Sequence, residues 1–316
     1  MAQKNIKPLL SRGDTIGLIT PAGFISEKKL NKTIENFRNL GLNVFYSKSV
    51  LEKKGYLAGD DKSRINELHS MYKNEDVKAI VCVRGGYGTT RLLDKINYDL
   101  IKQNPKPLIG YSDITALINA IYKKTGIPGF HGIVGSGDFP DYTVAGFKNM
   151  FFSSSEELKV ELFEGHKAGT YLITRGNMSG ELAGGNLAML ASMTGTPFEL
   201  SWDNKIVFLE DIGEAPYRID RMLTQLISGD KFKNVKGIIL GRFAECESEE
   251  KDKLNSFTLK EVLSDRIKPL KIPAVYGFSF GHIRNQSIFP TGVHANFDAD
   301  TFTISIKRKD INKFFN

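Results

Sequence analysis

The first part of the chain alternates short apolar runs with segments whose apolar residues recur at helical spacing. The run at 79–83 is unbroken, as expected for a strand that helices cover on both faces. Leu30, Ile34, Phe37 and Leu40 keep the spacing of one helix face. This alternation is typical of a doubly wound parallel sheet, whose ligands bind beyond the carboxyl ends of the strands. We therefore expect an α/β protein.

The expected elements follow from these patterns and from residues that begin or end them. In the first part they are strands at 15–19, 43–46, 79–83 and 108–110, and helices at 27–40 (begun by Ser26), 61–73, 91–96 and from 114. In the second part they are strands at 170–174, 179–182, 205–209, 237–240, 274–278 and 302–306, and a helix at 217–228.

The serine-rich stretch at 153–157 marks a change in this pattern. We expect a first domain at 1–152, a linker at 153–167 and a smaller, β-rich second domain at 168–316. The segment 245–253 is charged and poor in apolar residues, which is typical of an exposed loop.

Composition excludes several classes of protein. With 316 residues, of which 41% are hydrophobic and 25% charged, the chain has the composition of a globular protein. The net charge is +7, but the basic residues are spread along the chain, so we expect no nucleic-acid partner. No stretch has the roughly 20 apolar residues that span a bilayer, and no signal-peptide core precedes Pro8, so we expect a cytoplasmic protein without a membrane partner. Only Cys82 and Cys246 are present, which fits a reducing compartment.

Ser112 is the first candidate catalytic residue. It follows the apolar run at 108–110 and precedes a helical pattern, so it is expected on a strand-to-helix turn where a helix N-terminus offers unpaired N–H groups to an oxyanion. Two observations weigh against a nucleophile. Ser112 and Asp113 are ordinary helix-capping residues, and Ile114 stands where the G-x-S-x-G elbow has its second glycine.

A glycine-rich segment at 84–88 follows the buried strand at 79–83. It has neither the G-x-G-x-x-G spacing of a dinucleotide site nor the Lys-Ser/Thr of a phosphate loop. Three interpretations stay open: a simple turn, a nucleotide-binding loop, or a source of backbone N–H donors for an oxyanion. The third is favoured by the expected proximity of this loop to the serine turn at one sheet edge.

Glu210 and His282 are the other candidates. Glu210 ends the apolar run 206–209, where it either marks an exit to solvent or orients a histidine; Glu214 and Asp220 lie in or beyond the following loop and are expected at the surface. His282 lies in a glycine-flanked loop after the strand at 274–278. The other histidines are expected to be solvated or structural: His69, His131, His166 and His294. No cluster has metal-ligand spacing, so we expect no metal and no cofactor.

Taken together, these motifs resemble the LD-carboxypeptidase family of serine peptidases, which includes muramoyltetrapeptide carboxypeptidases and the microcin C self-immunity protein. The resemblance covers nearly the whole chain. Its motifs are Ile-Thr-Pro-Ala at 19–22, Arg-Gly-Gly-Tyr-Gly at 84–88, Gly-Tyr-Ser-Asp-Ile-Thr at 110–115, Gly-Gly-Asn-Leu at 184–187, Phe-Leu-Glu-Asp at 208–211 and Gly-His at 281–282.

The resemblance implies a Rossmann-like first domain, a β-rich second domain and a Ser-Glu-His triad across the cleft between them. Ser112 is then the nucleophile, Glu210 the orienting carboxylate and His282 the general base and acid. The implied oxyanion hole is formed by the N–H groups of Gly86 and Asp113.

Substrate binding is implied for Arg84, Gly85 and Tyr87 in the glycine-rich segment. Arg84 and Arg284 are both candidates for the substrate carboxylate, and the sequence does not choose between them.

The implied reaction releases the terminal D-alanine of a murein tetrapeptide during cytoplasmic peptidoglycan recycling, by an enzyme that is commonly a homodimer. The stretch 211–218 matches the tetrapeptidase branch better than the immunity branch. Two alternatives stay open: an immunity-type amidase acting on peptidyl or aminoacyl nucleotides, and a non-enzymatic protein that binds a nucleotide or sugar phosphate through the glycine-rich segment. The sequence does not distinguish lysine from diaminopimelate in the substrate.

Overall fold

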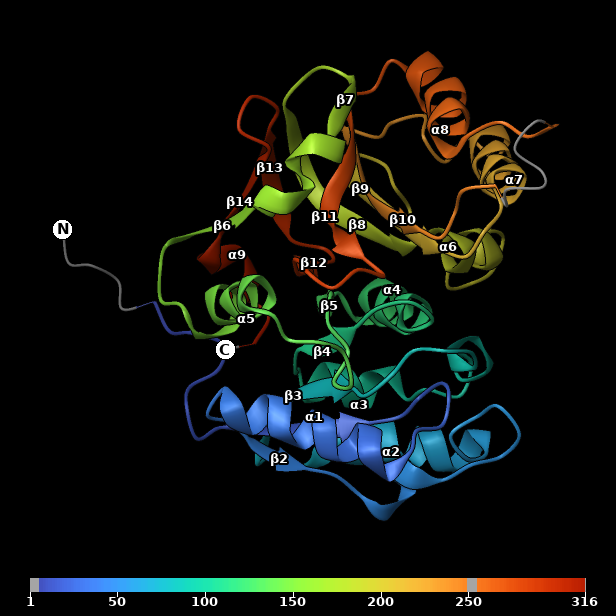
Figure 1. The fold of residues 1–316 in the computed structure, drawn as a ribbon. Helices are drawn as coiled ribbons and strands as arrows, with labels where there is room; N and C mark the ends of the chain where they lie inside the picture. Colours follow the sequence, from blue (N-terminus) through green and yellow to red (C-terminus); the bar gives the residue numbers. More distant parts are fainter. Residues whose placement is uncertain (1–5, 249–254, 316) are drawn as a thin grey trace.

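The computed structural model describes residues 6–248 and 255–315. These residues form two β-sheets, the first built mainly from strands in residues 15–131 and the second from strands in residues 157–307 (Figure 1). The strand order is β12-β5-β4-β3-β1-β2 in the six-stranded first sheet and β6-β14-β13-β8-β9-β10-β11-β7 in the eight-stranded second sheet. The expected α/β fold is confirmed.

The first sheet is parallel except at one edge. Its parallel strands are β1 (Thr15–Ile19), β2 (Asn43–Phe45), β3 (Val77–Cys82), β4 (Leu108–Gly110) and β5 (Gly129–His131), and β12 (Phe289–Pro290) pairs antiparallel with β5. Helix α1 (Glu27–Asn39) packs on one face of the sheet. Helices α2 (Asp61–Lys73), α3 (Tyr98–Gln103) and α4 (Ile114–Thr125) pack on the other. The sheet is therefore covered on both faces, as its apolar strands predict.

The second sheet is mixed. Its central strands β8 (Met178–Asn186), β9 (Lys205–Ile212), β10 (Gly237–Ala244) and β11 (Ala274–Gly281) are parallel. The flanking strands β6 (Glu157–Glu161), β7 (Tyr171–Thr174), β13 (His294–Asp298) and β14 (Thr303–Lys307) are antiparallel to their neighbours. Helices α6 (Leu187–Met193), α7 (Pro216–Ser228) and α8 (Leu259–Ile267) cover one face of this sheet.

The shorter elements connect these layers. They are η1 (Lys48–Leu51), η2 (Thr89–Arg91), α5 (Asp141–Phe147), η3 (Lys148–Phe152), η4 (Glu164–Gly169), η6 (Lys268–Leu270) and α9 (Arg308–Asn312). Among the described residues, no helix is long and apolar enough to cross a bilayer.

One apolar core joins the two sheets. The cluster that contains Phe130 of β5 continues to Phe208 of β9 and Phe280 of β11. Phe289 of β12 belongs to the first sheet, yet its ring centroid lies 5.2 Å from that of Phe208 and 4.6 Å from that of Phe280. In Figure 1, β5, β12 and α4 lie where the two halves meet.

The prediction of a helix at 91–96 is wrong. The chain instead forms the short turn η2 and further turns, and the α-helix begins later, at α3. The reason lies in Asn97, whose side chain accepts the Leu100 N–H at 2.9 Å and whose backbone is extended (φ −82°, ψ 91°). Because a capping residue has a non-helical backbone, α3 begins after this position and cannot be continuous with a helix at 91–96.

The segment expected as a linker, 153–167, contains β6 and most of η4. Leu158 and Val160 of β6 point into the shared core, and the strand pairs with β14. Of the loop expected at 245–253, residues 249–253 lie outside the described residues.

Candidate active site

Ser112 lies on the turn between β4 and α4, at the carboxyl end of the parallel strands. Its φ of 65° is in the left-handed region, which costs a non-glycine residue of order 1–3 kcal/mol. Gly85 packs directly against it, since a Cβ on Gly85 would lie 2.9 Å from the Ser112 Cβ. The turn is therefore held in a strained conformation by close neighbours, as is the nucleophile elbow of α/β-hydrolases.

Neither side chain of the expected capping pair caps α4. No side-chain capping bond is formed at the start of this helix. The Asp113 carboxylate instead accepts the Thr89 N–H at 2.9 Å, and the Thr89 hydroxyl donates to the Asp113 carbonyl at 2.6 Å. Burial raises the pKa of Asp113, against the opposing effect of the Thr89 N–H. The capping interpretation of this motif is therefore not supported by the structure.

The glycine-rich segment forms a loop after β3, beside the serine turn. Gly86 and Gly88 have φ of 120° and 131°, which side chains other than glycine's rarely adopt. Gly85 accepts the Gly23 N–H at 3.2 Å, and Arg84 Nη1 donates to the Phe24 carbonyl at 2.9 Å. The loop is thus fixed to the segment that follows β1.

Two backbone N–H groups at this edge are available to a ligand. Within residues 6–248 and 255–315, neither the Gly86 N–H nor the Asp113 N–H donates a hydrogen bond to another group. Tyr87 is half exposed, and its ring lies 5.5 Å from that of Tyr56, centroid to centroid.

Glu210 and His282 form a pair at the carboxyl ends of β9 and β11. His282 Nδ1 lies 2.8 Å from Glu210 Oε2, and the Glu210 side chain is fully buried. Gly281 makes the approach possible, because a Cβ at this position would lie 3.0 Å from Glu210 Oε2. A buried carboxylate on Nδ1 fixes the tautomer of the ring and leaves Nε2 to act as a base.

Tyr111 connects this pair to the serine turn. Its ring centroid lies 4.8 Å from that of His282, with the rings at 66°, and Ser112 is the next residue. Burial raises the pKa of the Tyr111 hydroxyl. The fold therefore brings the Glu210–His282 pair of the second half against the residue that precedes Ser112 in the first.

The sequence pattern assigns no role to Asp211, the last residue of the motif at 208–211, because its role depends on the fold. It accepts hydrogen bonds from Asn186 Nδ2 (2.8 Å), the Ala188 N–H (2.9 Å) and the Ile212 N–H (2.9 Å). Burial first, and then the charge of Glu210, raise the pKa of Asp211 to about 6. Asp211 therefore joins the end of β9 to the start of α6.

His131 is a second buried histidine close to the site. Its ring packs against Tyr111, Phe208 and Phe280, with centroids 5.4–6.0 Å apart. Burial lowers the pKa of His131 to about 4, although the charge of Glu210 acts in the opposite direction. Neither ring nitrogen has a hydrogen-bond partner among the described residues. The sequence predicts only a solvated or structural histidine here, and the structure places His131 at the end of β5.

The competing candidates lie in other surroundings. His69 accepts the Asn97 N–H at 3.0 Å, and His166 Nδ1 lies 2.9 Å from the Ser279 hydroxyl. Glu214 pairs with Arg218 at 3.5 Å, and Asp220 pairs with Arg266 at 3.5 Å. In the described part of the chain, no group of three or more His, Cys, Asp or Glu residues is placed to hold a metal ion.

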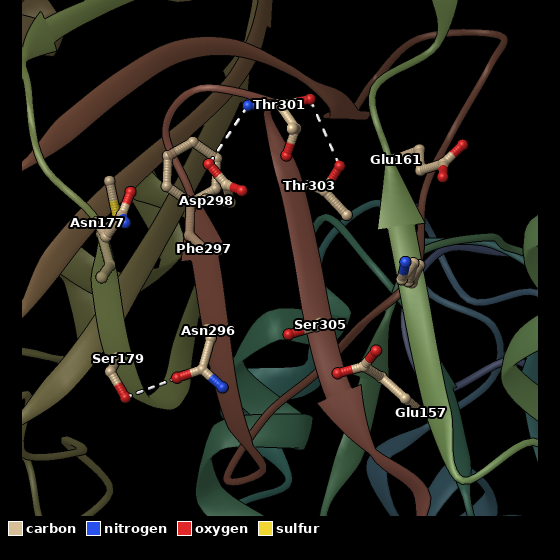
Figure 2. A pocket seen from close by; sticks show the side chains of 12 residues that line it. Glu157, Glu161, Asn177, Ser179, Asn296, Phe297, Asp298, Thr301, Thr303 and Ser305 are labelled. Carbon is tan, nitrogen blue, oxygen red and sulfur yellow. Dashed lines mark hydrogen bonds between the residues drawn. The ribbon is translucent and has the colours of Figure 1, made fainter.

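A hollow of about 730 Å³ lies elsewhere, on the open face of β8, β13, β14 and β6 (Figure 2). It is lined by hydroxyls, amides and carboxylates, and the Ser179 hydroxyl donates to Asn296 Oδ1 at 2.7 Å. None of the expected site residues lines it. The expected site residues therefore lie at the junction of the two halves rather than in this hollow.

Comparison with known proteins decides the family. Residues 16–132 match the LD-carboxypeptidase N-terminal domain, and residues 179–297 match the LD-carboxypeptidase C-terminal domain. The chain belongs to the LD-carboxypeptidase family.

Within this family, the chain is 40% identical to a probable murein peptide carboxypeptidase of Bacillus subtilis, over 92% of this chain and 91% of the relative. Two solved structures have the same fold. The muramoyltetrapeptide carboxypeptidase of Oxalobacter formigenes superposes with a TM-score of 0.79 and 31% identity, covering 92% of this chain and 97% of that one. The MccF protein in complex with glutamyl sulfamoyl guanosine gives a TM-score of 0.86 and 25% identity, covering 96% and 98%.

Proposed function

We propose that this LD-carboxypeptidase family member is a serine peptidase that releases the terminal D-alanine of murein tetrapeptides in cytoplasmic peptidoglycan recycling. The observation that carries the proposal is the buried pair of Glu210 and His282, packed through Tyr111 against the strained Ser112 turn. The 40% identity to a probable murein peptide carboxypeptidase supports the substrate class.

The proposed reaction begins with attack by the Ser112 hydroxyl on the carbonyl that joins the L-centre of the diamino acid to D-alanine. His282 accepts the hydroxyl proton at Nε2, while Glu210 stabilises the imidazolium through Nδ1. When the tetrahedral intermediate collapses, His282 returns this proton to the nitrogen of the leaving D-alanine. Water then hydrolyses the acyl-enzyme with the same base, which releases the tripeptide.

The oxyanion of the intermediate is proposed to bind the N–H groups of Gly86 and Asp113. Both are without a partner in the described residues, and they come from two loops at the same sheet edge. Donors that are fixed before the reaction stabilise the developing charge at little cost in reorganisation.

Arg284 is our candidate for the terminal carboxylate of the substrate. It lies two residues after His282, is exposed, and pairs with no carboxylate among the described side chains. Arg84, the other candidate, already donates one of its N–H groups to Phe24.

A second candidate function is an amidase that acts on aminoacyl or peptidyl nucleotides. It is favoured by the TM-score of 0.86 to MccF, against 0.79 for the muramoyltetrapeptide carboxypeptidase. The 40% identity to a probable murein peptide carboxypeptidase favours the first candidate.

The test is incubation of the purified protein with L-Ala-D-Glu-diamino acid-D-Ala peptides and, separately, with an aminoacyl sulfamoyl adenosine. Lysine and diaminopimelate peptides are both included, and products are identified by mass spectrometry. We expect the peptides to lose D-alanine and Ser112→Ala to abolish the loss. Cleavage of the sulfamoyl adenosine alone would favour the amidase, and cleavage of neither would contradict both.

A further inference from the structure

Arg64 is a buried arginine that the proposed reaction does not use. It lies on α2 and is 1% exposed. Its Nη2 donates to Asp61 Oδ1 at 2.6 Å, and Asp61 also accepts two hydrogen bonds from the exposed Arg91. The charge of Arg64 is therefore balanced by a carboxylate on its own helix, which lowers the cost of its burial.

The other terminal nitrogen of Arg64 joins two loops. Nη1 donates to the Pro21 carbonyl at 2.6 Å and to the Gly88 carbonyl at 2.9 Å. Pro21 follows β1 and Gly88 belongs to the glycine-rich loop after β3. A Cβ on Gly88 would lie 2.6 Å from Nη1, so the glycine is needed for this close contact.

The peptide between Gly88 and Thr89 is held from both sides. In a planar trans peptide the C=O and N–H groups point in opposite directions. Arg64 binds the carbonyl of this peptide, and the Asp113 carboxylate accepts its N–H at 2.9 Å. Asp113 directly follows Ser112, so the position of the glycine-rich loop is set relative to the serine turn.

We propose that Arg64 is a positioning residue of the oxyanion hole. Through the Gly88–Thr89 peptide, it fixes the loop that carries the Gly86 N–H against the turn that carries the Asp113 N–H. The inference rests on the proposed function, and it gives a residue of α2 a role in positioning the oxyanion hole. Arg64 itself touches no reacting atom.

A positioning role predicts a particular kinetic signature. Misplaced oxyanion donors weaken transition-state stabilisation more than substrate binding, so kcat falls while KM changes little. For Arg64→Met we expect kcat to fall by roughly 10- to 100-fold, with KM within about twofold of the wild-type value. Arg64→Lys should be intermediate, because an ammonium lacks the planar fork of the guanidinium.

Two further variants make the test specific. Arg91→Met is the matched control, since the Arg91 side chain binds the same Asp61 but donates no hydrogen bond to either loop in the described residues, and its kcat should stay within about twofold of wild type. Gly88→Ala displaces Arg64 Nη1 and also strains the loop backbone at φ 131°, so it should lower kcat at least as much as Arg64→Met. Because both changes remove the contact between Arg64 and Gly88, the double variant should lose less than the product of the two single losses.

The deciding experiment measures the rate of Ser112 modification by a fluorophosphonate probe, which needs an activated serine and an oxyanion hole but no particular peptide. Modified Ser112 is identified by peptide mass spectrometry, and urea unfolding establishes the folded fraction of each variant. We expect the wild type and Arg91→Met to react at similar rates and folded Arg64→Met and Gly88→Ala to react at least about 10-fold more slowly, with folded Arg64→Lys between them and the wild type.

Equal rates in wild type and folded Arg64→Lys, Arg64→Met and Gly88→Ala would overturn the role of Arg64 and leave the proposed function intact. A rise in KM with unchanged kcat would also overturn it, by assigning Arg64 to substrate binding. Failure of the wild type to react at Ser112 would overturn the proposed function and this inference with it. If Arg64→Met does not fold, Gly88→Ala and Arg64→Lys decide.

Discussion

At the scale of single residues, the backbone of Ser112 is the least expected feature of the site. A serine with φ of 65° persists only where its surroundings hold it. Gly85 packs against its side chain, and the neighbouring Asp113 is bound on both its carboxylate and its carbonyl by Thr89. The strain is thus maintained by contacts that also fix the loop with the free N–H groups.

The proposed triad predicts that its members act as a unit. Ser112→Ala and His282→Ala should each lower kcat for D-alanine release by roughly 10⁴-fold or more, and the double variant should be little worse than either. The measurement is steady-state kinetics with the tetrapeptide, with Thr224→Val on the exposed side of α7 as a control. Losses that multiply in the double variant would contradict a shared step.

Two buried groups beside the site have pKa values that the fold shifts in opposite directions, His131 downward and Asp211 upward. The folded chain keeps His131 neutral with its pKa near 4, below the usual 6.5, so its contribution to stability is full above pH 6.5 and is lost as pH falls toward 4. Asp211 has its pKa raised from 3.8 to about 6, so its contribution is full below pH 3.8 and is lost as pH rises through 6. Each interval corresponds to about 3 kcal/mol, and between pH 4 and 6 the two effects oppose each other.

Single variants should separate these effects. With Asp211→Asn, the remaining His131 should make the free energy of unfolding rise more steeply than in the wild type between pH 4 and 6. With His131→Gln, the remaining Asp211 should make the free energy of unfolding rise less steeply, or fall, over the same range. The double variant should have the wild-type slope. Urea unfolding across this pH range measures all four proteins. Identical slopes would contradict the assigned pKa directions.

At the scale of elements, α4 links the two halves. It packs on the first sheet, and from its other side Asn119 Nδ2 donates to the Gly184 carbonyl of β8 at 3.0 Å. One turn earlier, the buried Thr115 hydroxyl accepts the Asn186 N–H at 3.0 Å. The helix that starts at the serine turn is therefore fixed to the half that carries Glu210.

Thr115→Val tests this link with little change in shape. The variant leaves the Asn186 N–H buried and unpaired, which should lower the free energy of unfolding by about 1–3 kcal/mol. Thr224→Val on the exposed side of α7 is the matched control and should change the free energy of unfolding by less than about 0.5 kcal/mol. Urea denaturation of both proteins gives the comparison, and equal effects would show that the contact is unimportant.

Sequence patterns predicted the long elements well, because their apolar spacing is set by the same faces that pack in the fold. The strand β1 and the helix α2 have the expected bounds, Thr15–Ile19 and Asp61–Lys73. The patterns failed where tertiary pairing decides. β12 consists of two residues, one of them Pro290, and is a strand only because β5 offers it an edge.

The residues of the candidate site also divide into those that the sequence predicts and those that only the fold reveals. Ser112, Glu210 and His282 stand out in the sequence because each follows an apolar run, and strand ends of a parallel sheet gather ligands. Arg64 does not stand out, because an arginine on an amphipathic helix normally lies in solvent. Its burial depends on the carbonyls of Pro21 and Gly88, which lie 43 and 24 residues away in sequence.

At the scale of the whole molecule, the two halves share one core rather than meeting through a polar interface. Phe289 pairs through its backbone with the first sheet and packs through its ring with Phe208 and Phe280 of the second. Burial of these rings in one cluster makes the folding of each half depend on the other.

We therefore expect a single cooperative unfolding transition. Trp202, the chain's one tryptophan, is buried against Phe232 in the second half, so its fluorescence reports on that half. Amide hydrogen exchange in β3 reports on the first half. The two probes should give the same urea midpoint. Separate midpoints would show that the halves unfold independently.

The loop between β11 and β12 determines where the chain can be opened for circular permutation. His282 leaves the second sheet at Gly281, and seven residues further on Phe289 is already paired with the first, so the loop is anchored in both halves. A circular permutant opened at 284–287 would retain every residue of the enzyme but detach the imidazole from its second anchor. One opened at 229–231, in the exposed turn after α7, would leave both anchors intact. The short loop between β11 and β12 thus holds the His282 imidazole. Where the polypeptide is opened therefore decides whether this imidazole keeps its position relative to Ser112.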